Sequence, residues 1–129
     1  MNTDTLLSGL KVLVVEDVFM LAQDLADQLS GAGCTVIGPV PTVQQALDQA
    51  DSTALDGAVL DVNLRGDRSF PLAEQLARDG VPFIFLTGYD SVTVFPDQFR
   101  DAQKLTKPVD YKMLVEAVSR FRKGDPASG

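Results

Sequence analysis

The sequence contains no histidine, and this absence excludes several classes of enzyme. Without an imidazole the chain cannot form a Ser-His-Asp triad, a Cys-His nucleophile pair or a histidine-ligated zinc site. The single cysteine, Cys34, excludes an internal disulfide and a thiolate metal cluster. We expect it to be a small buried apolar residue. Any chemistry must therefore rest on carboxylates, hydroxyls and amines.

Basic residues and long apolar runs are also scarce. Lys and Arg number 11 against 18 Asp and Glu, and the net charge of −7 disfavours nucleic-acid binding, which needs a basic face. No apolar run approaches the roughly 20 residues that span a bilayer. The N-terminus lacks the basic start and apolar core of a signal peptide. We therefore expect a cytoplasmic protein that binds neither a membrane nor nucleic acid directly.

The chain does contain a regular alternation of short apolar runs and amphipathic stretches, over a length that suits one domain. The apolar, β-branched runs predict five strands: 11–15, 34–40, 58–62, 81–87 and 104–106. Apolar residues at helical spacing predict helices between them and after the last strand: 18–30, 42–50, 71–79 and from 110 onward. Residues 65–69 are predicted to be a polar loop.

Two helices carry predicted N-terminal caps. Thr42 and Gln45 form a T-x-x-Q capping box, and Asp110 is placed to cap the last helix. We expect the buried stripe of the last helix to consist of Met113, Leu114, Ala117, Val118 and Phe121. Residues 90–101 fit the alternation poorly, because β-branched residues weaken a helix and Pro96 interrupts one. We predict a loop there, with a short helix starting at Pro96.

Strands that alternate with helices predict an α/β fold with a parallel sheet. We expect a flavodoxin-like, doubly wound five-stranded sheet of order 2-1-3-4-5, an order known from other proteins of this kind, with a weak or irregular fourth helix. Residues 1–9 are predicted to be an N-terminal extension, 10–123 the domain, and 124–129 a disordered tail.

Polar side chains stand at the ends of four of the five predicted strands: Glu16, Asp17, Asp61, Thr87 and Lys107. Taken alone, each has an ordinary explanation, such as a helix cap, a β-forming threonine or a surface lysine. Because the carboxyl ends of parallel strands meet at one edge, we expect all five side chains to converge on one crevice.

The charges of this set predict a metal site. Three carboxylates and one ammonium leave an excess of two negative charges, which a single Mg²⁺ would offset. Mg²⁺ prefers oxygen ligands at about 2.0–2.1 Å and keeps several waters, so one carboxylate can remain free to react. Aspartate can act as a nucleophile toward phosphorus. We therefore predict that Asp61 accepts a phosphoryl group, with Lys107 and Thr87 contacting its oxygens.

Four motifs, in order, strongly resemble the receiver domain of bacterial two-component response regulators: VLVVED at 12–17, VLDVNL at 59–64, FLTGY at 85–89 and LTKPVD at 105–110. The resemblance covers about residues 10–122. It implies a Mg²⁺ site formed by Glu16, Asp17, Asp61 and the backbone carbonyl of Asn63, with Asp17 as a direct ligand.

The resemblance also implies roles and partners. Asp61 would be the phosphoacceptor, Thr87 the switch hydroxyl and Lys107 the phosphate-binding lysine. A histidine kinase or a histidine phosphotransfer protein would supply the phosphoryl group from its own phosphohistidine. The chain would then be a signalling protein that catalyses only its own phosphorylation and dephosphorylation.

Two positions depart from the usual receiver pattern. Most receivers carry an aromatic switch residue where this chain has Lys104. The segment PFIFLTGY at 82–89 is similar to a PFxFATGY-type subgroup, and we predict that Tyr89 takes over part of the role of the missing aromatic. Receivers often have a cis bond at the position of Lys107–Pro108, and we expect one here.

Several alternatives remain open at the sequence level. The chain resembles a stand-alone receiver that signals through protein contacts, and Tyr111, Val115 and Arg122 lie off the buried stripe of the last helix as a candidate partner surface. A pseudo-receiver that is never phosphorylated is a second interpretation. A small Mg²⁺-dependent phosphohydrolase is a third, although such enzymes want a second Asp where this chain has Asn63.

Overall fold

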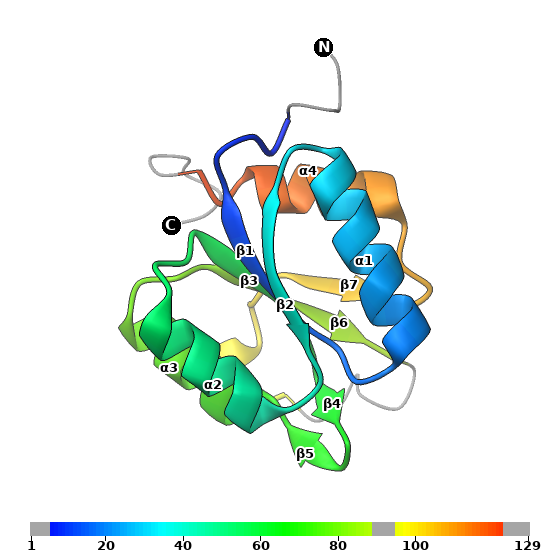
Figure 1. The fold of residues 1–129 in the computed structure, drawn as a ribbon. Coiled ribbons are helices and arrows are strands. Elements are labelled where there is room, and N and C mark those ends of the chain that lie inside the picture. Colours follow the sequence, from blue (N-terminus) through cyan, green and yellow to red (C-terminus); the bar gives the residue numbers. More distant parts are fainter. Residues whose placement is uncertain (1–5, 89–94, 123–129) are drawn as a thin grey trace.

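A computed structural model describes residues 6–88 and 95–122 (Figure 1). The strands in these ranges are β1 (Lys11–Val15), β2 (Thr35–Val40), β3 (Gly57–Asp61), β4 (Asn63–Leu64), β5 (Asp67–Arg68), β6 (Phe83–Thr87) and β7 (Lys104–Thr106). The helices are α1 (Phe19–Gly31), α2 (Val43–Ser52), α3 (Phe70–Arg78), a 3₁₀ helix η3 (Asp97–Phe99) and α4 (Tyr111–Ser119). In the described ranges, no helix combines the length and the apolar character that crossing a membrane requires.

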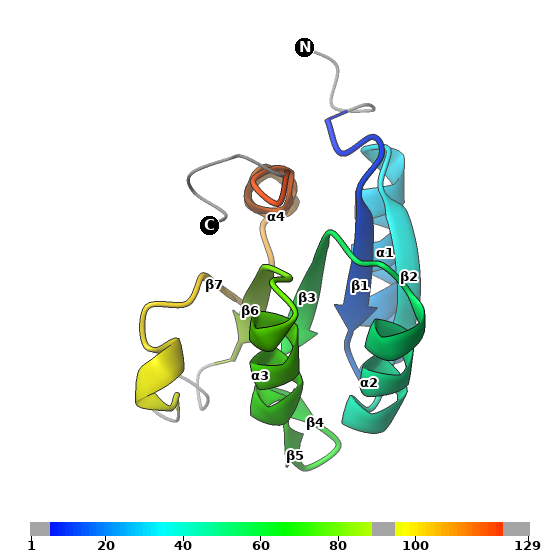
Figure 2. The ribbon, with the colours of Figure 1, turned by 90° about the vertical axis from the view of Figure 1, so that its left-hand side faces the viewer.

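Five strands form one parallel sheet in the order β2-β1-β3-β6-β7, which confirms the predicted fold class and order. The three central strands are buried on both faces, as their continuous apolar sequences require. Figure 2 shows the arrowheads of β1, β3 and β6 pointing toward the same end of the molecule. The residues at their carboxyl ends are therefore neighbours.

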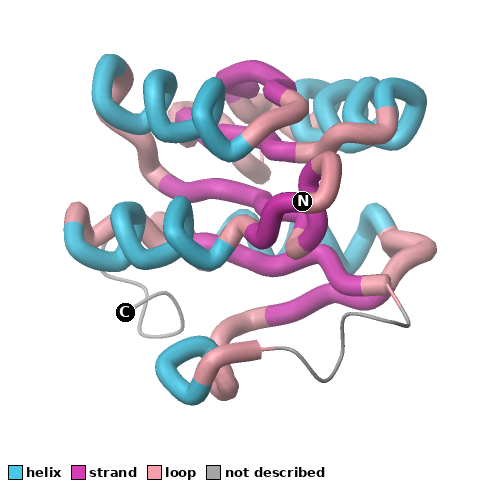
Figure 3. Tube along the Cα trace, turned by 90° about the horizontal axis from the view of Figure 1, so that it is seen from below, coloured by secondary structure: helices cyan, strands magenta, loops and turns pink. Residues whose placement is uncertain are grey.

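The helices cover both faces of the sheet (Figure 3). Helices α1 and α4 bury Leu25 and Leu114 against one face, together with Val12 and Val14 of β1. Helices α2 and α3 bury Ala46 and the three apolar residues of α3 against the other face. The caps form as predicted: Thr42 accepts a hydrogen bond from the Gln45 N–H, and Asp110 accepts from the first turn of α4.

The predicted polar loop at 65–69 is wrong in part, because β4 and β5 form a small antiparallel hairpin. Its turn consists of Arg65 and Gly66, both with positive φ, at 51° and 88°. This left-handed conformation is natural for glycine and uncommon for arginine. The hairpin begins at Asn63, two residues after Asp61 at the end of β3.

Residues 6–10 pack into the domain. Leu7 is fully buried and its N–H donates to the carbonyl of Ala32 at 2.8 Å. Leu10 is also buried in the core under α1 and α4. Arg122 Nη2 donates to the carbonyls of Leu6 and Ser8, at 2.8 and 3.1 Å. Residues 6–9 of the predicted N-terminal extension are therefore packed against the domain and hydrogen-bonded to Arg122, near the other end of the described chain.

The structure describes only part of the segment that connects β6 to β7. Of the predicted loop, residues 90–94 lie outside the described ranges, as does the predicted tail at 124–129. Pro96 directly precedes η3, so a short helix does begin there as predicted. Five phenylalanines pack together between this turn, α3 and β6: Phe70, Phe83, Phe85, Phe95 and Phe99. The Lys107–Pro108 bond is cis, as predicted.

Candidate functional site

The polar residues expected at the carboxyl edge of the sheet do come together there. Glu16 and Asp17 follow β1, Asp61 is the last residue of β3, and Lys107 follows β7. Oxygens of the three carboxylates lie within 4.8 Å of one another. Strands β1, β3, β6 and β7 follow one another in the sheet, so the backbone itself brings the side chains at their ends together.

Lys107 joins two of the carboxylates. Its Nζ lies 2.9 Å from Glu16 Oε1 and 2.9 Å from Asp61 Oδ2. Glu16 is 2% exposed and Asp61 6%, so the ammonium offsets charges that water barely reaches. A buried carboxylate without such a partner would be strongly unfavourable. The lysine is therefore the cation of this centre.

Asp17 is held by the hairpin. Its Oδ2 accepts a hydrogen bond from the backbone N–H of Arg65 at 3.1 Å. Glu16 Oε2 accepts from the backbone N–H of Val18 at 3.1 Å. Arg65 was not predicted as a site residue, because a backbone donor in a left-handed turn leaves no sequence motif beyond the following Gly66.

Thr87 is buried at the end of β6, and its carbonyl accepts the N–H of Lys107 at 2.8 Å. The residue before it, Leu86, pairs with Asp61 in the sheet, which places Thr87 at the same edge. Asn63 lies in β4, half-buried and two residues beyond Asp61. Both residues are therefore where the predicted roles require them, although those roles remain predictions.

The environment shifts two ionisation equilibria. Burial raises the pKa of Glu16 to about 7, against the lowering effect of its hydrogen bonds to Lys107 and the Val18 N–H, and the nearby charge of Asp61 adds to the rise. Burial alone would lower the pKa of Lys107, but its hydrogen bonds and charge interactions with Glu16 and Asp61 outweigh this and raise it. Lys107 thus stays protonated, whereas Glu16 titrates near neutral pH.

The centre suits a hard divalent cation. One oxygen of Asp61 is used by Lys107 and one oxygen of Asp17 by Arg65. The two carboxylates are close enough to share an ion. Two carboxylate oxygens plus waters and a carbonyl make an ordinary Mg²⁺ site. The donor set therefore fits the predicted metal.

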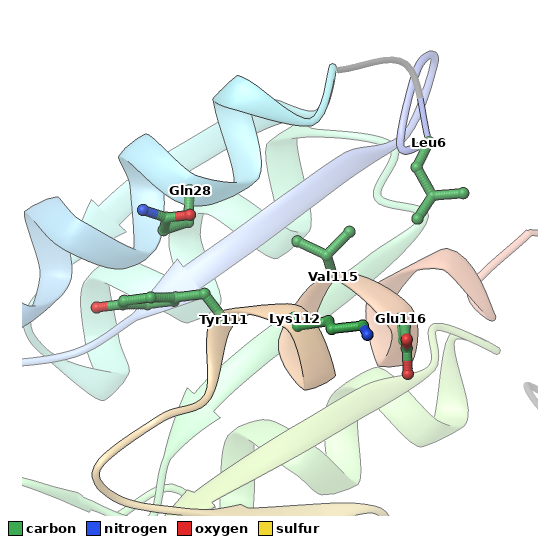
Figure 4. Close-up of a pocket in the computed structure, with 6 residues that line it drawn as sticks. All are labelled: Leu6, Gln28, Tyr111, Lys112, Val115 and Glu116. Carbon is green, nitrogen blue, oxygen red and sulfur yellow. The ribbon is translucent and has the colours of Figure 1, made fainter. Parts of the chain in front are cut away.

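Of the other predicted site residues, Tyr89 lies outside the described residues. Tyr111 and Val115 of α4 line a groove toward α1 and Leu6 (Figure 4). Arg122 bonds to the N-terminal segment, so at least part of its side chain serves the fold. Their role as a partner surface stays a prediction.

A cluster of exposed apolar residues beside the centre was not predicted. Val18, Phe19 and Met20 are 53%, 78% and 76% exposed, directly after Asp17. The sequence predicted a helix from residue 18 onward, but the helix begins one residue later, with Val18 as its N-cap. The signal available in the sequence was three consecutive apolar residues, more than one helical stripe can bury.

The fold and the centre define a doubly wound α/β protein with three carboxylates and a lysine at the carboxyl edge of its sheet. Comparison with known proteins makes this assignment specific. The chain matches the family described as "Response regulator receiver domain" over residues 12–119, and it belongs to that family.

Individual relatives agree with this assignment. The solution structure of SdrG from Sphingomonas melonis Fr1 is 37% identical, with a TM-score of 0.76 over 94% of this chain and 98% of that one. The sensory transduction protein LytT of Bacillus subtilis is 27% identical over 117 residues, which are 88% of this chain and 48% of that protein. The transcriptional regulatory protein PdtaR of Mycobacterium tuberculosis is 28% identical over 120 residues, 87% of this chain and 58% of that protein. The chain thus spans about half the length of the curated relatives it matches.

Proposed function

We propose that this receiver accepts a phosphoryl group on Asp61 and signals in the cytoplasm through protein contacts. The observation that carries the proposal is the contact of Lys107 with both Glu16 and Asp61, beside the third carboxylate of Asp17. This arrangement leaves one reactive carboxylate among groups that can neutralise phosphoryl oxygens. It suits phosphoryl transfer, in which positioning and charge stabilisation supply most of the catalysis.

In the proposed step, a carboxylate oxygen of Asp61 attacks the phosphorus of a phosphohistidine on a partner protein. The new P–O bond forms as the P–N bond breaks, and the imidazole leaves with the bonding electrons. The ammonium of Lys107 pairs with the phosphoryl oxygens as they separate from the donor. Thr87, at the end of the neighbouring strand, donates its hydroxyl hydrogen to one of these oxygens.

The metal in this proposal is Mg²⁺, held by Asp17, Asp61 and the carbonyl of Asn63, with Glu16 close by. When bound, it supplies positive charge to the crowded oxygens and orients the incoming phosphoryl group. The chain itself keeps Asp17 in place through the Arg65 N–H. The side chain of Glu16 is buried, and its carboxylate pairs with the ammonium of Lys107. Glu16 therefore holds Lys107 from the interior of the protein.

The donor in this proposal is a histidine kinase or a histidine phosphotransfer protein, which provides the imidazole that the chain lacks. Exposed Val18, Phe19 and Met20 beside the centre support contact with a protein donor at this edge, since large exposed apolar residues in a cluster mark contact surfaces. Once phosphorylated, the protein would act by binding another protein, with Tyr111 and Val115 as candidate contacts.

Intact-mass analysis after treatment with acetyl phosphate tests the proposal. We expect one added phosphoryl group in the presence of Mg²⁺ and none in EDTA, because the carboxylates repel the donor without the metal. Asp61→Asn is expected to abolish the addition. Asp79→Asn is a matched control on the surface at the end of α3, and it should accept phosphate as the unmodified protein does.

The outcomes also separate the alternatives. No added mass in any condition would support a pseudo-receiver that only binds partners. Repeated release of phosphate from a simple phosphomonoester would support a phosphohydrolase. The intact set of Asp17, Asp61 and Lys107 argues against the first alternative, and Asn63 in place of an acid argues against the second.

A further inference from the structure

Lys104 stands out because its ammonium folds back onto backbone carbonyls of the preceding turn. It lies in the edge strand β7, where a lysine ordinarily extends into water. Here Nζ instead donates to the carbonyls of Phe99, Arg100 and Ala102, at 3.2, 2.8 and 2.9 Å. An ammonium has three hydrogens to donate, so these three carbonyls match its full capacity.

The three carbonyls belong to the turn that contains η3. The last carbonyls of a helix have no partner within the helix and attract a cation. Lys104 supplies both the hydrogen bonds and the charge. The turn's own backbone bonds run from the N–H groups of Phe99, Arg100 and Ala102 to the carbonyls of Pro96, Asp97 and Phe99, at 2.9, 3.2 and 3.1 Å. The ammonium therefore adds three charge-assisted hydrogen bonds to a turn that these bonds and the packing of Phe99 also hold.

The same ammonium lies 4.6 Å from the centre of the Phe95 ring, within cation–π range. Phe95 in turn packs edge-on against Phe85, with ring centres 5.0 Å apart. Phe85 is fully buried in β6 and lies on the same face of that strand as Thr87, two residues on. A continuous series of contacts thus leads from Lys104 to the strand end that carries Thr87.

We propose that Lys104 is a positioning residue: it fixes the 96–102 turn and Phe95 against β6, and it does so whether or not Asp61 carries a phosphoryl group. Its side chain is held by backbone carbonyls on one side and a ring on the other, so the turn moves as one unit with β7. The anchor deepens the proposed function, because it would keep the Thr87 strand end steady while the site is occupied.

Amide hydrogen exchange on the full chain tests the anchor without any phosphorylation. Lys104→Met keeps the length of the side chain and removes its charge. We expect it to raise the exchange rates of the Phe99, Arg100 and Ala102 amides about tenfold, the effect of losing hydrogen bonds from a charged group. Lys104→Arg should restore rates to within about threefold, since a guanidinium also donates several hydrogen bonds and stacks on rings.

A control separates a local anchor from general stability. Asp110→Ala removes the cap of α4 and lowers stability by about 1 kcal/mol without touching the turn. If Asp110→Ala raises the exchange of the same three amides as much as Lys104→Met does, or if Lys104→Met leaves them unchanged, the anchor is refuted. Slow exchange of these amides in Asp110→Ala together with fast exchange in Lys104→Met supports it.

A second measurement tests whether the anchor persists in the phosphorylated state. Adding beryllofluoride with Mg²⁺, a mimic of aspartyl phosphate, should leave the three amides as protected as before in the unmodified protein. A tenfold loss of protection would overturn the claim that the anchor persists. Because the first measurement needs no phosphoryl group, failure of the proposed function would leave its result standing.

Discussion

Glu16 couples the stability of the protein to pH. Its pKa is about 7 in the folded protein against 4.5 as the ordinary value, so between these pH values the folded state holds more protons than the unfolded state. The free energy of unfolding therefore falls as pH rises through this window. This effect belongs to the metal-free protein, because a bound cation would favour the ionised carboxylate.

Glu16→Gln should remove this dependence. Glutamine resembles the protonated acid, so we expect the mutant and the unmodified protein to be similar near pH 5 in EDTA. Near pH 8 the mutant should be more stable, by on the order of 1–2 kcal/mol. Urea unfolding at both pH values measures the difference. A difference that stays constant from pH 5 to pH 8 would contradict the interpretation.

At the residue scale, the sequence predicted which groups meet but not how they are bonded. Glu16, Asp61 and Lys107 were identifiable because each ends or follows an apolar strand of a parallel sheet. The inward turn of Lys104 was not, since it depends on three carbonyls presented by a turn whose shape no motif specifies. Backbone donors such as the Arg65 N–H are equally invisible in side-chain patterns.

At the scale of elements, the start of β3 depends on having no side chain at Gly57. Phe121 follows α4 in the chain, and its ring packs against Gly57. A Cβ built on Gly57 would lie 2.1 Å from this ring. Gly57→Ala should therefore force the ring out of place and destabilise the protein by about 1–3 kcal/mol. Chemical denaturation of the purified variant measures this.

Gly31 offers the matched control for that substitution. It is the last residue of α1, and a Cβ there meets nothing within 4 Å. Gly31→Ala should be neutral or stabilise the protein by up to about 1 kcal/mol, because alanine favours helix more than glycine does. Equal effects of the two substitutions would show that the contact with Phe121 is not responsible.

The elements were predicted to within one or two residues wherever an apolar pattern was strong. The predicted bounds of the first and last strands match β1 and β7. The hairpin was missed because Arg-Gly is a weaker turn signal than Asn-Gly. Met113 was assigned to the buried stripe of the last helix but is 53% exposed, since the stripe that faces the sheet is narrower than the apolar pattern.

At the scale of the whole molecule, Mg²⁺ should act on stability in two ways. The chain carries a net charge of −7, so any salt screens its self-repulsion. A Mg²⁺ site that exists only in the folded protein also raises the free energy of unfolding, by an amount that grows with the concentration of the ion. Thermal melting should therefore rise more in MgCl₂ than in NaCl of equal ionic strength.

Asp17→Asn distinguishes the two contributions. It removes one carboxylate of the centre, so we expect most of the Mg²⁺-specific rise in melting temperature to disappear while the NaCl response remains. Asp27→Asn, on the exposed side of α1, should keep the full Mg²⁺ response. If MgCl₂ and matched NaCl raise the melting temperature equally in the unmodified protein, the proposed metal site is absent.

The burial of Leu7 and Leu10 has a practical consequence for anyone shortening this protein. The family match runs from residue 12 to residue 119, and a fragment cut at those limits would discard both leucines together with Phe121 and Arg122. The apolar core residues beneath α1 and α4 that these side chains cover would then be exposed to water. Such a fragment would be prone to aggregation, and expression trials should begin upstream of Leu6.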